Sequence, residues 1–278
     1  MITAEQKKQF NEKGYLLVPG VLSAEQVAQM RKSILQIFAS DEWKKSPYNT
    51  ERVLSDVFQT FPEFIDLTLT DKVLQVVSGL LGPNPLLMPE SSIHYKFYTG
   101  WHKDTTSQEK AGHTFHLNDN SLMIEAGFYL QDNNEYGGGL TVMEGSHRTP
   151  DYFVNPAAPG IVERVKNKLV TIPEQKNERI NPNHHTLVDI PSKAGDLVIF
   201  NFKTNHRATR PSVGTIDQVP KEIEKIAFFN AFSINNETGH QYVDYLKSRP
   251  EPFYQNLPQR IVCEKLKQKA TQLAFTAL

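Results

Sequence analysis

Short strand-like runs recur through the middle of the chain, and they constrain the fold more than any other feature of the sequence. From about residue 85 onward, these runs are separated by Gly, Asn, Asp and Pro, a spacing typical of a sandwich or barrel. No helix-sized pattern lies between them, which argues against a doubly wound α/β sheet. We therefore predict an all-β core with flanking helices. The expected strands are residues 92–98, 122–130, 140–143, 186–190, 197–201 and 226–232.

Helices are expected before this core. Thr3 and Ser23 are each followed three residues later by Gln, which is the capping-box pattern of a helix N-terminus. The second box opens a predicted helix over residues 23–38 that carries an apolar stripe. Residues 14–20 predict one short strand closed by turn residues, and residues 70–81 predict another helix that stops before Gly-Pro.

The remaining segments complete a single predicted domain. Residues 40–50 are polar and predict a loop, whereas residues 251–278 have a helical pattern. The Pro- and Lys-rich stretch 151–183 predicts an excursion between strands, and loops of that length are usually lids or binding elements. The predicted domain spans residues 1–278, with N-terminal helices at about 3–82, the core at about 85–235 and a helical C-terminal segment at about 236–278.

Composition excludes several classes of protein. The chain has 30 basic and 31 acidic residues, for a formal net charge of −1, so a general nucleic-acid binder is not expected. Cys263 is the single cysteine, which excludes an internal disulfide and a Cys-rich zinc module. No apolar run approaches the roughly 20 residues that cross a bilayer, and the N-terminus lacks the apolar stretch of a signal peptide. We expect a cytoplasmic protein without membrane partners.

A histidine and an aspartate two residues apart follow one predicted strand. On an extended backbone, His102 and Asp104 would face the same side, with Lys103 pointing outward. One imidazole and one carboxylate are two of the three ligands in a 2-His-1-carboxylate facial triad. His206, which follows the predicted strand at 197–201, is the candidate for the third. Such a triad would leave positions open on iron for a bidentate 2-oxo acid and O₂.

Four stretches, taken in order, resemble the phytanoyl-CoA dioxygenase family of Fe(II)/2-oxoglutarate oxygenases. A His-x-Asp pair alone is a weak signal, but the ordered set is specific and covers most of residues 10–232. The stretches are FNEKGYLLVPG at 10–20, WHKD at 101–104, YLQD at 129–132 continuing to GLTVMEGSH at 139–147, and AGDLVIF at 194–200 continuing to His206.

The resemblance implies a double-stranded β-helix, which is a cupin-like jelly roll. It also implies Fe(II), 2-oxoglutarate and O₂ as cofactor and co-substrates, with ascorbate supportive in vitro, and conversion of 2-oxoglutarate to succinate and CO₂. Asp104 stands where related halogenases carry a small residue, so hydroxylation of an unactivated C–H is the expected outcome. Polar residues around the His-x-Asp motif predict a small, polar substrate; the sequence makes no prediction for the oligomeric state.

The chain departs from the family where the distal carboxylate of 2-oxoglutarate is held. The family usually carries an arginine about ten residues after the distal histidine, but position 217 here is an aspartate. By strand position, Lys225 takes the arginine's place, although an ammonium lacks the bidentate fork of a guanidinium. Arg210, four residues after His206, is the competing candidate.

Other polar residues have weaker functional interpretations. Lys96 has the same strand parity as His102 and could point inward, although a buried lysine needs a partner. His113 and His116 are expected at the surface or in contact with substrate. His147 is expected to have a structural role in a turn, and the pair at 184–185 is expected in a loop.

Two competing functions remain open at this level. The missing arginine would suit a catalytically silent jelly-roll protein that binds a small molecule, whereas the intact candidate triad argues against it. A metal-dependent lyase or hydrolase on the same scaffold is the other alternative.

Overall fold

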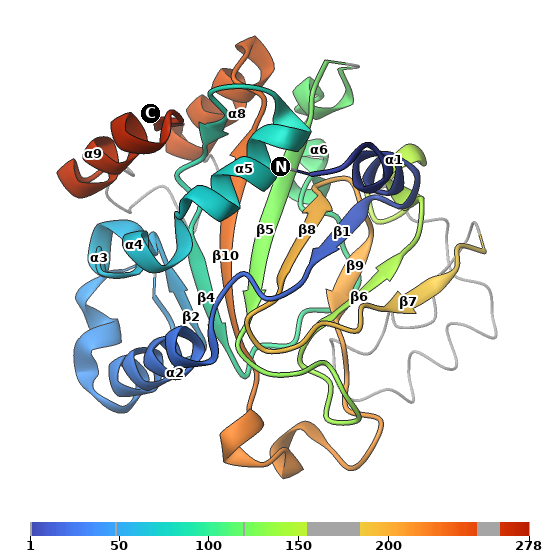
Figure 1. Cartoon of the computed structure of the whole chain (residues 1–278). Helices are drawn as coiled ribbons and strands as arrows, with labels where there is room; N and C mark the ends of the chain where they lie inside the picture. Colours follow the sequence, from blue (N-terminus) through green and yellow to red (C-terminus); the bar gives the residue numbers. More distant parts are fainter. Residues whose placement is uncertain (1, 48, 119, 155–183, 249–261, 278) are drawn as a thin grey trace.

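A computed structural model gives the arrangement of most of the chain (Figure 1). It describes residues 2–47, 49–118, 120–154, 184–248 and 262–277. The predicted excursion at 151–183 and the start of the predicted segment at 251–278 therefore lie largely outside the described residues.

The N-terminal elements confirm their sequence signals. Thr3 and Ser23 each accept a hydrogen bond from the backbone N–H three residues later, and both capping boxes are complete. Gly14, in the left-handed conformation at φ 85°, ends the first helix and turns the chain directly into a strand. The three elements are α1 (Ala4–Lys13), β1 (Tyr15–Val18) and α2 (Ala24–Ala39).

The segment that follows is more structured than predicted. The expected loop at 40–50 contains a 3₁₀ helix, η1 (Asp41–Lys45). Three further short elements have no periodic pattern long enough to predict: β2 (Val53–Ser55), α3 (Val57–Thr60) and α4 (Phe64–Thr68). The predicted helix at 70–81 is α5 (Asp71–Leu81), whose first turn is capped by the side chain of Thr70.

Eight strands form a large sheet in the order β1-β8-β5-β10-β3-β11, with β4 and β2 joined to it through β10. Its centre is the antiparallel pair of β5 and β10, in which Ala227 faces Tyr129 and Ser233 faces Met123. The strands not yet defined are β3 (Leu86–Leu87), β4 (Ser92–Tyr95), β5 (Met123–Tyr129), β8 (Leu197–Asn201), β10 (Ile226–Ser233) and β11 (Thr276–Ala277).

A smaller sheet in the order β7-β6-β9 completes the core. It consists of β6 (Leu140–Met143), β7 (Leu187–Asp189) and β9 (His206–Ala208). Val142 and Leu140 from this sheet share one buried cluster with Tyr129 and Phe200 from the large sheet. The two sheets therefore pack against each other, as expected of a jelly roll. The six predicted strands are confirmed, although the one at 92–98 already ends at Tyr95.

Helices cover the outer face of the large sheet (Figure 1). The largest apolar cluster combines residues of α2 to α5 with the outward-facing residues of β5, β8 and β10. Phe228 on β10 lies in this layer, with its ring centroid 5.8 Å from that of Phe58 and 5.7 Å from that of Phe64. The C-terminal helices are α8 (Glu237–Ser248) and α9 (Glu264–Leu273).

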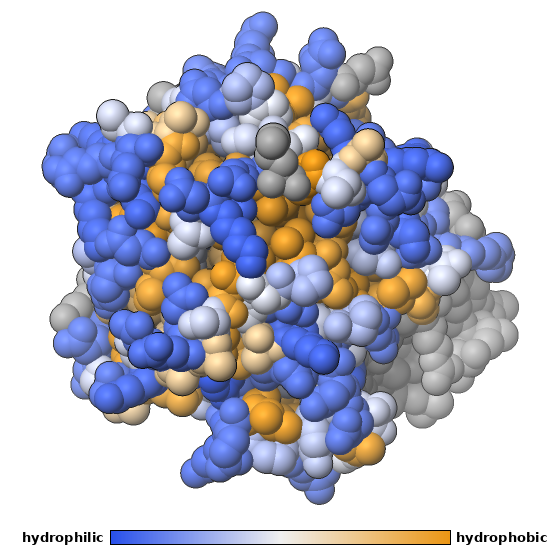
Figure 2. Space-filling view, viewed as in Figure 1, coloured by the Kyte–Doolittle hydropathy of each residue, from blue (hydrophilic) through white to orange (hydrophobic). Residues whose placement is uncertain are grey.

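Polar side chains cover much of the face seen in Figure 2, with apolar side chains interspersed among them. Within the described residues, no helix combines the length and the apolar character that a membrane crossing requires.

Candidate active site

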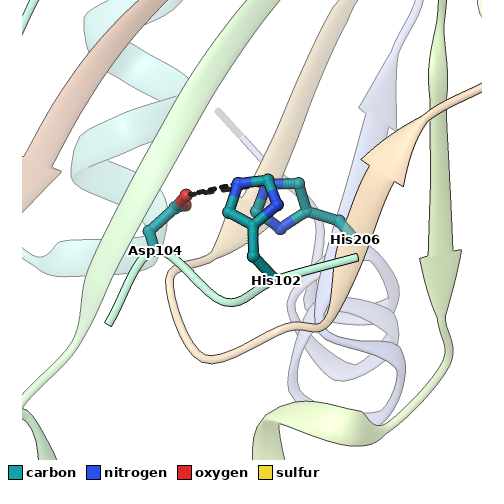
Figure 3. A group of neighbouring side chains, drawn as sticks. All are labelled: His102, Asp104 and His206. Carbon is teal, nitrogen blue, oxygen red and sulfur yellow. Dashed lines mark ion pairs between the residues drawn. The ribbon is translucent and has the colours of Figure 1, made fainter. Parts of the chain in front are cut away.

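Two side chains that are neighbours in sequence and a third about a hundred residues further along the chain converge in the structure (Figure 3). His102, Asp104 and His206 each place one possible ligand atom within 4.8 Å of the others. Oδ1 of Asp104 lies 3.7 Å from Nε2 of His102 and 3.6 Å from Nε2 of His206. This is the group that the sequence predicted.

Backbone pairing brings the two segments together. His102 and His206 form an antiparallel bridge, with the N–H of each residue donating to the carbonyl of the other at 3.1 and 2.9 Å. The N–H of Asp104 donates to the carbonyl of Phe202 at 3.0 Å. The predicted strand has already ended at Tyr95. A single bridge followed by a turn therefore holds His102 and Asp104 on the same side of the backbone.

Both imidazoles are oriented by backbone carbonyls. Nδ1 of His102 lies 2.7 Å from the carbonyl oxygen of Gly100, and Nδ1 of His206 lies 2.9 Å from that of Thr204. Because a carbonyl oxygen only accepts hydrogen bonds, each Nδ1 must carry the proton, and each Nε2 has a free lone pair toward Asp104. This orientation is the outer-shell arrangement that metal-binding histidines usually have.

The charge states also match a metal site. Burial lowers the pKa of both histidines to about 4, so they are neutral at pH 7 and able to bind a metal. Burial raises the pKa of Asp104 to about 7, and its Oδ2 has no hydrogen-bond partner. A divalent cation between the three side chains would supply the missing partner. The residues therefore fit the iron that a 2-His-1-carboxylate set binds.

Lys103 was expected to point outward, and the structure shows that its side chain is nevertheless buried. Only 3% of it is exposed, and its Nζ donates to the carbonyls of Ser146 at 3.0 Å and Thr149 at 2.6 Å. The physical reason is that the turn around η3 (Ser146–Arg148) covers this side of the motif. Burial lowers the pKa of Lys103 to about 8.

The candidate triad lies in the wall of a cavity of about 440 Å³, a size typical of small-molecule sites. Lys225, directly before β10, lines the same cavity and is only 3% exposed. Its Nζ donates to the carbonyl of Phe97. Burial, and secondarily the charge of Arg210, lowers the pKa of Lys225 to about 7.

Arg210, the competing cation, is not among the residues that line this cavity. Its guanidinium lies 5.6 Å from the ring centroid of Tyr98, and Nζ of Lys225 lies 5.5 Å from the same centroid. The two cations are therefore neighbours, but only the lysine is part of the cavity wall.

The other residues considered from sequence lie elsewhere. Lys96 adopts a positive φ of 50° after the end of β4, which breaks the strand parity, and its ammonium forms an ion pair with Glu224 at 2.5 Å. His113 packs edge-on against Tyr245. His116 is fully buried and paired with Glu109 at 3.2 Å, so the expectation of a surface or substrate-contact position is wrong for it.

The histidines of the later turns do not join the triad. Nε2 of His147 lies 3.0 Å from the carbonyl of Asn11, which ties the turn after β6 to α1. His184 is exposed. Nε2 of His185 lies 3.4 Å from the hydroxyl of Thr149.

Two carboxylates in the cavity were not singled out from sequence. Glu90 and Glu125 both line it. Glu125 is an acidic residue within an otherwise apolar predicted strand, and that contrast is the signal that could have identified it. Glu90 follows a proline in a loop and carries no comparable signal.

Comparison with known proteins gives a consistent assignment. The family model of phytanoyl-CoA dioxygenase (PhyH) matches residues 10–212, more than half of the chain. An ectoine dioxygenase from Sphingopyxis alaskensis is 23% identical over 272 residues, which cover 91% of this chain and 82% of the relative.

Two solved structures show the same fold. EctD from S. alaskensis with bound Fe has a TM-score of 0.54 at 22% identity, covering 84% of this chain and 75% of that one. EvdO2 from Micromonospora carbonacea var. aurantiaca complexed with 2-oxoglutarate has a TM-score of 0.55 at 16% identity, covering 84% and 91%. The predicted double-stranded β-helix is thereby confirmed. The chain belongs to the phytanoyl-CoA dioxygenase family, whose members are non-haem iron dioxygenases dependent on 2-oxoglutarate.

Proposed function

We propose that the enzyme hydroxylates an unactivated C–H of a small polar metabolite. His102, Asp104 and His206 bind Fe(II) in this proposal. Lys225 binds the distal carboxylate of 2-oxoglutarate. Overall, substrate, O₂ and 2-oxoglutarate become hydroxylated substrate, succinate and CO₂. The observation that carries the proposal is the convergence of two correctly oriented imidazoles and one unpaired carboxylate oxygen in a cavity.

The iron and its co-substrate, when bound, supply the oxidising power. The chain's own residues perform the other tasks. The carbonyls of Gly100 and Thr204 hold the imidazoles in one tautomer, and Lys225 provides a fixed positive charge for an anionic co-substrate. The buried rings of Phe200 and Phe202 in the cavity wall exclude water from the reacting C–H.

The site suits a small molecule with polar groups. Thr106, Ser107 and Gln108, which follow the His-x-Asp motif, and His94 before it all line the cavity. A cytosolic location would suit the free thiol of Cys263 and the reduced state of the iron.

Iron binding by single-site variants tests the metal assignment. In His102→Ala, Asp104→Ala and His206→Ala proteins, we expect anaerobic Fe(II) titration in the presence of 2-oxoglutarate to give no visible charge-transfer band, because two ligands do not retain the ion. His113→Ala is the matched control, since His113 lies outside the cavity. A wild-type band that persists undiminished in any one of the three ligand variants would exclude that residue as a ligand.

A second pair of variants tests the co-substrate assignment. Removing the ammonium in Lys225→Met should weaken 2-oxoglutarate binding about ten- to hundred-fold, because a hydrogen bond to a charged group is worth about 1.5–3 kcal/mol. Arg210→Met, which removes a cation outside the cavity, should change the Kd much less. Calorimetric titration of the iron-loaded proteins measures both values, and the opposite ranking would assign the role to Arg210.

A further inference from the structure

The wall of the cavity contains groups of both charges. Lys225, directly before β10, contributes a cation, and Glu90 and Glu125 contribute carboxyl groups. When iron binds, its two positive charges and the single positive charge of Lys225 are balanced by the carboxylate of Asp104 and the two carboxylates of 2-oxoglutarate. Lys103 is committed to the carbonyls of Ser146 and Thr149. Glu90 and Glu125 add two further acidic groups to the same wall.

Glu125 is the more informative of the two. On β5, Ile124 and Ala126 point into the helix-covered core, whereas the alternate residues Glu125 and Tyr129 line the cavity. Glu125 is 8% exposed, and its Oε1 has no hydrogen-bond partner. A buried carboxyl without a donor is costly, so such a group indicates that a ligand supplies the partner.

A second acceptor in the same wall is also unpartnered. Gln108 is 3% exposed, and its Nε2 donates to the hydroxyl of Tyr242 at 2.8 Å, which leaves its Oε1 buried without a donor. The hydroxyl of Tyr242 in turn donates to Oε2 of Glu90 at 3.0 Å. This chain of hydrogen bonds fixes the orientation of Gln108 and Glu90, so that the acceptors are preorganised.

Aromatic rings line the same cavity as these acceptors. Phe202, Tyr242 and Tyr245 line the cavity, and the ring centroid of Tyr242 lies 5.8 Å from that of Phe202 and 6.1 Å from that of Tyr245. Ring faces attract cations. Carboxylates, an amide oxygen and aromatic rings are groups that suit a positively charged nitrogen that carries N–H groups.

We propose that Glu125 and Glu90 bind a cationic, N–H-bearing group of the substrate, such as an ammonium, amidinium or guanidinium. The inference deepens the proposed function, on which it rests, by naming the substrate class: a small cationic or zwitterionic nitrogen compound. Gln108 accepts a further hydrogen bond from the same group. Burial and the nearby charges of Asp104 and Glu90 raise the pKa of Glu125 well above its usual value, and an incoming cation would favour its ionised form.

Matched pairs of small probes test the proposal on the protein loaded with Fe(II) and 2-oxoglutarate in the absence of O₂. The pairs are acetamidine and acetamide, methylguanidine and methylurea, and butylamine and butan-1-ol. Their Kd values are measured by calorimetry, and the charge-transfer band is followed in parallel. We expect at least one cation to bind about tenfold or more tightly than its neutral partner, as a charge-assisted hydrogen bond predicts.

Variants then locate the binding group. Glu125→Gln keeps the shape of the side chain but removes its charge, so it should reduce the affinity for the preferred cation about tenfold while the charge-transfer band remains. Glu90→Gln should act in the same direction and serves as the second variant. Glu237→Gln, on the exposed face of α8, is the matched control.

The possible failures are distinguishable. Absence of the charge-transfer band in the wild-type protein would refute the proposed function itself. A normal band with no cation preferred over its neutral partner in any pair would overturn the present inference alone. A cation preference that both glutamate variants leave unchanged would likewise overturn it.

Discussion

Lys225 places a titratable cation in the wall of the cavity, where we propose that it binds 2-oxoglutarate. Its pKa is lowered to about 7, mainly by burial and secondarily by Arg210, with His94 and His206 also facing it. A lysine whose pKa is lowered in this way loses its charge above that value, and an anionic co-substrate prefers the charged form. If Lys225 binds the co-substrate as proposed, proton uptake should be coupled to 2-oxoglutarate binding above neutral pH.

The pH dependence of co-substrate affinity follows from this coupling. Below about pH 7, the Kd for 2-oxoglutarate should change little; above it, the Kd should rise toward about tenfold per pH unit. Lys225→Arg should flatten the profile, because a guanidinium stays protonated. Calorimetry on the iron-loaded proteins across this range measures both profiles, and parallel slopes in the two proteins would contradict a role for the lysine's titration.

At the scale of single residues, the candidate triad could be predicted because residue spacing and motif order both indicate it. Glu125 was not predicted, since the sequence does not show which face of a fully buried strand lines a cavity. The burial of Lys103 depends on the turn at Ser146, more than forty residues away, and no local pattern reveals such a contact.

At the scale of elements, strands with clear turn signals at both ends were predicted to the residue. β6 and β8 match their predicted ranges 140–143 and 197–201. β2, α3 and α4 were missed because elements of three to five residues show no measurable period, and their structure comes from packing against the sheet. The end of β4 at Tyr95 depends on the left-handed conformation of Lys96, which its sequence does not predict.

The packing of the helices on the large sheet depends on single aromatic residues. Phe228 on β10 is fully buried, and its ring packs against the rings of Phe58 and Phe64. Phe228→Ala should lower the free energy of unfolding by about 3–5 kcal/mol through lost burial and the resulting cavity. Chemical denaturation measures it, with Leu187→Ala, which truncates an exposed side chain on β7, as the control. Equal effects of the two substitutions would contradict this view of the core.

At the scale of the whole molecule, we propose that residues 1–278 fold as one domain. The C-terminal strand β11 pairs with β3, so that Thr276 faces Leu86. Lys265 and Lys269 of α9 form ion pairs with Asp66 of α4 at 2.7 and 3.1 Å. The last elements thus complete both the sheet and the helical layer that cover the core.

Deleting residues 262–278 should therefore lower the Tm of the whole protein, since it exposes the edge of β3 and apolar surface of the core. Differential scanning calorimetry should show one transition in the full chain and the same single transition at lower temperature in the truncated one. Lys265→Ala, which removes only a half-exposed ion pair, should change stability by less than about 1 kcal/mol. A separate transition for the C-terminal segment in the full chain would argue against one domain.

The backbone bridge between His102 and His206 joins parts of the chain about a hundred residues apart. A ferrous ion held there would act as a reversible crosslink that closes this long loop, and closing a long loop removes much of the freedom of the unfolded chain. The cell's supply of iron would then set not only how much of this protein is active but also how long each copy survives heat and proteolysis.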